Sequence, residues 1–360
     1  MQRLKQIMEN RFTLLALGVP LALIAVLLNA FAPKLIVDIY TFALISLMMT
    51  LGFQIFMGNS GILNWVYIGF VGIGAFASSI VSVPAAVKEM GTPNMYPFLK
   101  AIDFNMSQTV LGLQMGPLVG ILAAVLIALA VAAVFAWPLM RLSDAVGAIT
   151  QFAALIVIYV VMTQWDNVTN GPRTFFGVPL FTTLWVALAG AILTLLIAWF
   201  FKESRLGLRL RASRDDKYAA MSTGVNVIAS RYVAFILSAV VAAFSGALWA
   251  HYVLSFSPKT FYISEMFVII SMLVVGGTGS VTGAVVGTGV VTIVRQFLRQ
   301  IEASPAVNVT GLTEVCLAIF LILVLIVKPS GITGGRELTW GAMKRFFARF
   351  GKKKGEVHES

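Results

Sequence analysis

The stretch PLVGILAAVLIALAVAAVF, residues 117–135, is an unbroken apolar run. A helix needs about 20 mostly apolar residues to cross a bilayer, and runs of this kind recur along the 360-residue chain. Hydrophobic residues make up 59% of the chain and charged residues 11%, against about 25% charged in a typical soluble domain. A transmembrane β-barrel would instead show segments of about ten residues with alternating polarity. The sequence therefore predicts an all-α, polytopic membrane protein and excludes an ordinary soluble enzyme.

The apolar runs predict about ten transmembrane helices. They fall near residues 12–31, 39–57, 64–83, 117–138, 145–163, 181–201, 232–254, 263–276, 284–300 and 309–327. An even number of crossings returns the chain to the side on which it started. We expect one transmembrane domain over residues 1–330, with an inner loop over 202–231, and a basic cytoplasmic tail over 331–360.

The basic residues are distributed unevenly along this topology. The formal charge of +11 could by itself suggest a nucleic-acid partner. With the first tail inside, however, the inner segments carry 19 of the 26 Lys and Arg residues: three in the first tail, Arg141, seven in the inner loop and eight from Lys328 onward. Such asymmetry orients helical membrane proteins. It therefore indicates a lipid bilayer and no nucleic acid as partner, with both termini cytoplasmic.

Two glycine-rich stretches are candidates for broken or re-entrant backbone. One leads from Gly58 and Gly61 into the third expected crossing, and the other surrounds 276–289. Glycines at such spacing also let helices pack closely, and both interpretations stay open. Irregular backbone is tolerated in a membrane only where protein or water covers it, as along a translocation path. The candidate path residues are Asn59, Asn64, Tyr67, Gly72, Gly74, Thr150, Gln151, Ser238, Gly276, Gly277 and Gly279.

Catalytic and metal-binding patterns do not occur in the sequence. The only histidines are His251 and His358, so a multi-histidine metal site cannot be built. The string Gly276 to Gly283 lacks the Lys of a phosphate-binding loop. We expect no enzyme activity and no cofactor in this chain, and any ATP would be hydrolysed by another chain. The expected crossings have no central carboxylate, which disfavours an ion-coupled carrier; a passive channel stays an alternative.

The inner loop has its own helix signals. The stretch Ser213-Arg-Asp-Asp216 is a variant of the capping box that predicts a helix start. Gly224 can take the left-handed conformation that ends a helix, so we expect a helix from Arg214 to Thr223. A helix this short is marginal alone in water. Its apolar face, with Tyr218 and Met221, suits a groove on a partner protein, although a solvated loop is the alternative.

Sequence stretches along most of the chain point to one family. They are Gly58–Phe76, Thr169–Pro179, Ser204–Gly207, Arg211–Asp216, Ala219-Ala220, Gly224–Asn226, Ala234–Ser238, Ser245–Leu248, Val274–Gly277, Gly279-Ser280, Gly283 and Lys328–Gly331. In content, order and spacing the chain resembles the permease subunits of branched-chain amino-acid ABC importers of the LivM type.

The resemblance implies a machine with several subunits. Ala219, Ala220 and Gly224 match the family's coupling helix, which docks on an ATPase subunit. The residues expected to take part in this coupling are Ser213, Asp215, Asp216, Tyr218, Ala219, Ala220, Met221 and Gly224. The implied partners are a second permease subunit, two ATP-binding subunits that hold ATP and Mg, and an external substrate-binding protein. The implied location is a bacterial or archaeal cytoplasmic membrane.

The cargo implied by the resemblance is a branched-chain or other small amino acid. Three regions depart from the family pattern: Asn64-Trp65-Val66-Tyr67 stands where Ser-Leu-Gly-His is common, and Thr174 replaces a glycine. After Arg141-Leu142, Asp144 and Val146 replace the usual Gly and Tyr. If these regions line the path, the cargo differs from leucine, isoleucine or valine. Urea and short amides, which similar permeases carry, are the alternative.

Overall fold

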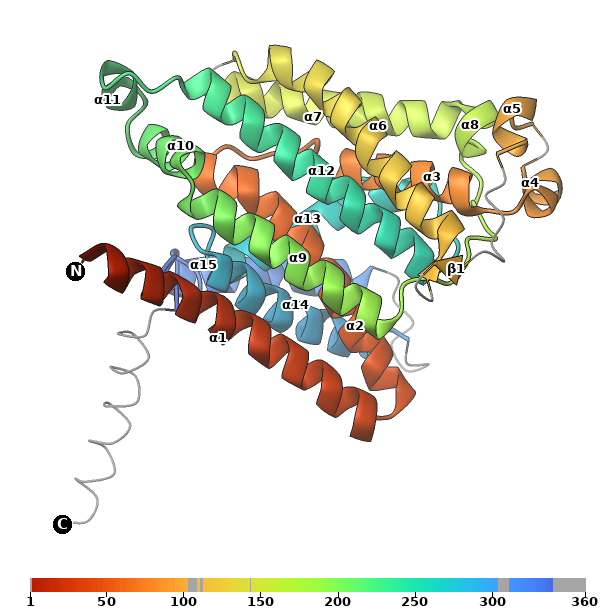
Figure 1. Ribbon diagram of the computed structural model, residues 1–360, viewed down its shortest axis with the longest axis horizontal. Helices are drawn as coiled ribbons and strands as arrows, with labels where there is room; N and C mark the ends of the chain where they lie inside the picture. Colours follow the sequence, from red (N-terminus) through yellow and green to blue (C-terminus); the bar gives the residue numbers. More distant parts are fainter. Residues whose placement is uncertain are drawn as a thin grey trace.

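The computed structural model of the chain describes residues 2–92, 94–102, 109–110, 113–142, 144–303 and 311–338. These residues are mostly α-helical (Figure 1). One short antiparallel hairpin, β1 (Thr109–Val110) with β2 (Leu113–Gln114), precedes helix α6. The prediction of an all-α protein is confirmed.

The helices follow the apolar runs of the sequence and the loops between them. Their bounds are α1 (Gln2–Phe31), α2 (Lys34–Phe53), the π-helical turn η1 (Gln54–Gly58), α3 (Tyr67–Ser82), α4 (Ala85–Gly91), α5 (Pro97–Lys100), α6 (Met115–Leu139), α7 (Asp144–Gln164), α8 (Asp166–Thr169), α9 (Leu184–Glu203), α10 (Arg205–Asp215), α11 (Lys217–Ser222), α12 (Val227–Val253), the 3-10 turn η2 (Pro258–Phe261), α13 (Ile263–Gly276), α14 (Val281–Glu302) and α15 (Leu312–Val327).

Seven helices in the described part of the chain are long and apolar enough to cross a membrane. They lie in α1, in α2 with η1, and in α6, α7, α9, α12 and α14; α3 and α4, bent by 117°, would make an eighth as one broken span. Helices α13 and α15 are apolar but shorter. The 14 residues of α13 extend over about 21 Å, less than the roughly 30 Å of a hydrocarbon core. The protein is therefore a multi-pass membrane protein, while the count of ten crossings stays a prediction.

Helix α12 runs through the middle of the bundle and packs against α2, α3 and α6 (Figure 1). Its contact with α3 requires glycine on both helices. A Cβ atom at Gly74 would lie 2.2 Å from the carbonyl oxygen of Ala243, and one at Gly246 would lie 2.1 Å from that of Val71. The two backbones therefore touch directly, as small residues permit between membrane helices.

The two ends of the bundle differ. Helices α10 and α11 lie at the same end as the start of α1, whereas α4, α5 and α8 lie at the opposite end (Figure 1). The hydroxyl of Thr13 in α1 donates to the carbonyl oxygen of Leu338 at 3.0 Å. The first helix, the inner loop and the last described residues are thus neighbours on one side of the molecule.

Candidate functional site

Helix α2 changes pitch before it ends, and this produces the first break in the membrane backbone. Its last turn, η1, is π-helical, and residues 61–64 have no helical structure before α3 begins at Tyr67. Gly58 is required at the end of η1, because a Cβ atom there would lie 2.5 Å from the carbonyl oxygen of Thr278. Gly61 has a φ of 73°, which glycine adopts without strain. The broken backbone predicted for this stretch is present.

Several polar side chains are buried around the first break without complete hydrogen bonding. Gln54, Asn59 and Asn64 are each at most 1% exposed. Within the described residues, neither amide atom of Gln54 has a partner, nor do the side-chain oxygens of Asn59 and Asn64. Leaving such an atom unpaired costs about 1–3 kcal/mol. These amides can therefore accept hydrogen bonds from, or donate them to, a polar molecule that enters the break.

Helix α7 contributes two further candidate path residues. Gln151 is buried, and its side-chain oxygen also lacks a partner among the residues that the structure describes. Its neighbour Phe152 packs edge-on against Trp65, with ring centroids 5.5 Å apart. Thr150 is half-buried and donates to the carbonyl oxygen of Val146 within its own helix. Of the two residues, Gln151 resembles the buried amides of the first break.

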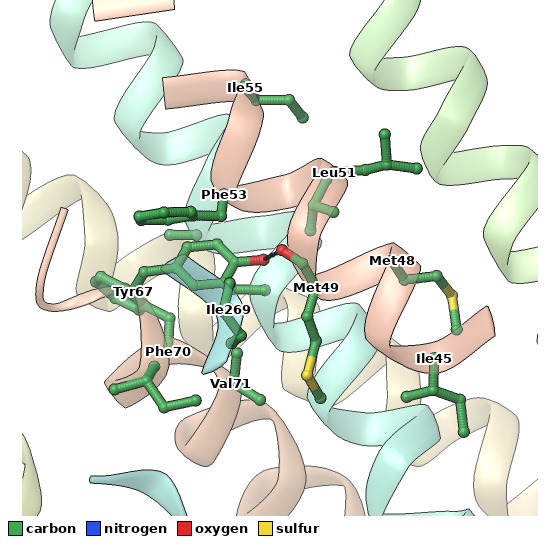
Figure 2. Close-up of a cluster of buried hydrophobic side chains, with 14 of the residues drawn as sticks. Ile45, Met48, Met49, Leu51, Phe53, Ile55, Tyr67, Phe70, Val71 and Ile269 are labelled. Atoms are coloured by element: carbon green, nitrogen blue, oxygen red, sulfur yellow. Dashed lines mark hydrogen bonds between the residues drawn. The ribbon is translucent and has the colours of Figure 1, made fainter. Parts of the chain in front are cut away.

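Tyr67 and Ser238 hold the end of α2 in place rather than facing an open passage. The Tyr67 hydroxyl donates to the carbonyl oxygen of Met49 at 2.7 Å, and its ring packs against Phe53 at 5.3 Å (Figure 2). The Ser238 hydroxyl donates to the carbonyl oxygen of Gly52 at 2.8 Å. Both side chains are fully buried and hydrogen-bonded. Their role in the structure is to fix the helix end beside the break.

The glycines of α3 serve packing in the same way. Gly74 meets the backbone of α12, and a Cβ atom at Gly72 would lie 2.9 Å from Met162 Sδ and 3.0 Å from the side chain of Phe261. The structure places both glycines at closely packed contacts between elements. For these two candidates it supports the packing interpretation.

The second glycine-rich stretch separates α13 from α14. Gly277 has a φ of 116°, and Ser280 caps α14 by accepting a hydrogen bond from the Gly283 amide at 2.9 Å. A Cβ atom at Gly276 would lie 1.8 Å from the carbonyl oxygen of Gly283, and one at Gly287 would lie 1.9 Å from that of Met272. The two helices therefore form a hairpin whose backbones touch.

Residues 328–338, here named the C-terminal strap, close over this second break. The Ile332 amide donates to the Val275 carbonyl oxygen at 2.8 Å, and Thr333 donates to the Gly276 carbonyl oxygen from its amide and its hydroxyl. The Glu337 carboxylate accepts from the amides of Val281 and Thr282 at 2.8 and 3.1 Å. The strap therefore packs on the helical body as far as Leu338, while the expected division at residue 330 stays a prediction; residues 339–360 of the expected tail lie outside the described part.

Glu337 also forms an ion pair with Lys202 at the end of α9. Burial disfavours the charged carboxylate, but the Lys202 ammonium and the hydrogen bonds from Lys202 and Thr282 outweigh it and hold the pKa of Glu337 below its ordinary value. Because it accepts from the amides of Val281 and Thr282, the carboxylate lies at the N-terminus of α14. The helix dipole also favours negative charge there.

Two cations of the inner loop reach the two breaks. Arg214 of α10 donates to the carbonyl oxygen of Gly58 at 2.7 Å, and Lys202 donates to that of Gly279 at 2.9 Å. A cavity of about 520 Å³ lies between them, lined by Ser60, Gly61, Arg214, Thr278 and the first turns of α7. The inner loop, both breaks and this cavity therefore form one connected region, which we name the inner junction.

The helix predicted from Arg214 to Thr223 is wrong in its start. Ser204 caps α10 by accepting from the Gly207 amide, and α10 continues through Asp215. Ser213 is buried inside this helix and donates to the carbonyl oxygen of Leu210 instead of capping. Two Ser residues can each begin a helix here, and the earlier one prevails because the helix it starts buries Leu210.

Asp216 is the cap of the shorter helix α11. Its carboxylate accepts from the amides of Tyr218 and Ala219 at 2.9 and 3.0 Å. Helix α11 ends at Ser222, and Gly224 follows with a φ of 81°, so the predicted stop is present. Ala220 is buried, whereas Tyr218 is 81% exposed. Ala219 and Met221 are exposed as well, which leaves one face of α11 uncovered on this chain. Asp215, the last residue of α10, is also exposed.

The matches to known proteins cover the region just described. A family model described as "Branched-chain amino acid transport system / permease component" matches residues 35–327. The chain belongs to this permease family. The permease protein LivM of Salmonella typhimurium is 25% identical over 331 residues, with 82% of this chain and 69% of the relative covered. LivM of Escherichia coli is 24% identical with the same coverage.

A second kind of relative matches part of the permease. LivH of Salmonella typhimurium, also a branched-chain amino acid transport permease protein, is 31% identical over 155 residues, or 43% of this chain and 47% of the relative. No solved structure matches the chain. The resemblance to LivM-type permeases is thus confirmed, and this chain is a transport permease subunit, which is not itself an enzyme.

Sequence reasoning missed four residues of the inner junction. Gln54 had a signal, because it is an amide within an otherwise apolar run. Arg214 and Lys202 had none, since the inner loop holds seven basic residues that look alike in sequence. Glu337 lay in the part assigned to the tail. The interactions of these three charged residues join positions far apart in the chain.

Proposed function

We propose that this permease is the membrane subunit of an ATP-binding cassette importer that translocates a branched-chain or other small amino acid. The external binding protein delivers the cargo, two ATP-binding subunits hold ATP and Mg, and a second permease subunit completes the membrane part. The observation that supports this most directly is the pair of contacts from the inner loop to the two breaks, Arg214 to Gly58 and Lys202 to Gly279.

These contacts link a docking surface to the proposed path. The uncovered face of α11, with Tyr218 and Met221, suits a groove on an ATP-binding subunit. Movement of α11 passes to α10 through their shared boundary at Asp216, and Arg214 carries it to the break. A switch of this kind alternates the path between inward-open and outward-open states.

The cargo is proposed from the buried polar groups. Among the described residues, the buried side chains with unpaired polar atoms at the first break are the neutral amides of Gln54, Asn59 and Asn64, so the break binds a small polar molecule weakly and leaves selectivity to the binding protein. Urea and short amides pair with such amides equally well and are the second candidate. Uptake of labelled leucine, isoleucine, valine and urea by the complete reconstituted transporter separates the two.

The coupling test compares two arginines of α10 in that reconstituted transporter. In Arg214→Gln, ATP-driven uptake falls by about tenfold, as for loss of one charge-assisted hydrogen bond, while the ATP-binding subunits still co-purify. The control Arg209→Gln removes the same charge from an exposed position of the same helix and keeps uptake within about twofold. Unchanged uptake in Arg214→Gln would remove the inner junction from the mechanism.

The orientation is tested by labelling. We propose that the end with α1, α10 and the strap faces the cytoplasm, as the charge distribution predicts. After Cys316→Ser, a cysteine at the exposed position Asn94 reacts with an impermeant maleimide from outside, and one at the exposed position Arg209 does not. The reverse pattern would overturn the topology.

A further inference from the structure

A second cavity lies away from the inner junction, between the adjacent ends of α6 and α12 and beside α11. Its volume is about 480 Å³. Three basic residues line it, each from a different segment: Arg141 after α6, Lys217 of α11 and Arg231 of α12. No acidic residue is among its described lining. A cavity with this basic lining attracts an anion.

The cavity with the basic lining adjoins a second, mostly apolar cavity. An adjoining cavity of about 510 Å³ shares Arg141, Asn226 and Ile228 with the first and adds Trp137 and Tyr232. Trp137 is 60% exposed, and the Arg141 guanidinium stacks over its ring at 3.9 Å. A ligand that fills both cavities has a charged head beside an apolar body.

The depth of these cavities identifies the kind of ligand. Helix α6 ends at Leu139 and α12 begins at Val227, and both are long enough to cross the membrane. The cavities therefore lie where two spans leave the hydrocarbon, at the level of the lipid headgroups. Trp and Tyr side chains are typical of this level, and basic pockets between membrane helices bind anionic headgroups there.

We propose that these joined cavities bind one anionic phospholipid. Its phosphate lies among Arg141, Lys217 and Arg231, and an acyl chain follows the hollow beside Trp137 and Tyr232. Because Lys217 belongs to α11, the bound lipid steadies the helix that carries the exposed Tyr218. Met221 and Gly224, which are expected to take part in coupling, also line the first cavity, so the lipid lies beside the surface proposed to dock an ATP-binding subunit. Lipid binding can still be tested on this chain alone.

The test measures lipid retained by the purified full-length chain, using native mass spectrometry with dioleoyl phosphatidylglycerol and dioleoyl phosphatidylcholine. The chain retains phosphatidylglycerol in preference, and Arg141→Gln with Lys217→Gln lowers this retention by about tenfold or more, at about fivefold for each basic group. The control Arg205→Gln with Arg209→Gln removes two exposed charges of the inner loop that do not line the cavity and retains the lipid within about twofold.

Further arms separate the alternatives. Arg141→Lys keeps the charge and retains most of the lipid, which excludes misfolding as the cause of loss, and each variant is checked by its thermal unfolding. Inorganic phosphate in excess does not displace the lipid, because it lacks the apolar body; displacement by phosphate would mean an anion site without lipid specificity and would overturn the proposal. Equal retention of both lipids, or unchanged lipid retention in the double variant, would overturn the proposal. If the double variant also no longer co-purified the ATP-binding subunits, the surface would be assigned to protein docking instead.

Discussion

The two glycine-rich breaks look alike in sequence, but the structure gives them different surroundings. Around the first break, buried amides of Gln54, Asn59 and Asn64 have atoms without hydrogen-bond partners among the described residues. Around the second, residues of the C-terminal strap, Glu337 among them, hydrogen-bond to the end of α13 and the start of α14. The first break therefore has unpaired hydrogen-bonding atoms among the described residues, whereas the backbone at the second break is hydrogen-bonded by the C-terminal strap.

The difference shows that glycine has two separate uses in this membrane protein. At the first break it permits irregular backbone beside polar side chains, which lipid would penalise. At Gly276 and Gly287 it lets two helices touch, because a Cβ atom would lie within 2 Å of a carbonyl oxygen. The first break therefore combines irregular backbone with buried amides, and the second joins α13 closely to α14.

The largest effect is expected from adding a methyl group where α13 and α14 touch. Gly276→Ala forces backbone apart between α13 and α14, and we expect it to lower the stability of the purified chain by about 3 kcal/mol. The measurement is thermal or denaturant unfolding in detergent. Gly289→Ala is the matched control, since its Cβ would meet nothing within 4 Å and alanine raises helix stability by up to about 1 kcal/mol. Equal stability of the two variants would show that the hairpin is not closely packed.

The next prediction concerns the first break, where we expect a substitution to lower transport without lowering stability. Gln54→Leu removes two unpaired buried polar atoms, so the stability of the chain stays equal or rises by about 1 kcal/mol. Uptake by the complete transporter falls by about tenfold, because the amide can no longer hydrogen-bond to the cargo. Thr292→Val is the control in α14, because the Thr292 hydroxyl is also buried without a partner in the described residues. It leaves uptake unchanged; equal loss in both variants would erase the distinction between the two regions.

The smallest effect concerns pH and the strap. Because the folded-state pKa of Glu337 is lowered, its contribution is complete above the ordinary value of 4.5 and is lost as the pH falls through the lowered folded value. The protection factors of the amides in residues 275–283, corrected for the intrinsic pH dependence of exchange, should therefore be constant between about pH 6 and 8 and fall in acid. Glu337→Gln removes this acid-dependent step and weakens protection by about 1 kcal/mol. A wild-type acid response that survives in Glu337→Gln would assign it to another group.

Features that depend on one short, continuous stretch of chain could be predicted from the sequence. The apolar runs located the membrane helices because each run must satisfy its own backbone hydrogen bonds in lipid. Gly58 to Tyr67 indicated a break, and Gly224 indicated the stop of α11, since both are properties of a short stretch. The start of the inner helix could not be located this way, because the capping-box variant at Ser213 lies inside α10, which Ser204 begins and which buries Leu210.

From the sequence alone, the all-α membrane class, the resemblance to the permease family and the positions of most apolar helices could be predicted, whereas both glycine-rich stretches stayed open between broken backbone and close packing. Only the tertiary structure decided which break keeps unpaired polar groups and which is closed. The contacts responsible join Arg214 to Gly58 across 156 positions and Lys202 to Glu337 across 135. Hydropathy and capping depend on residues within one continuous stretch of chain, whereas the partner of a charged side chain is set by the packing of helices that are distant in sequence.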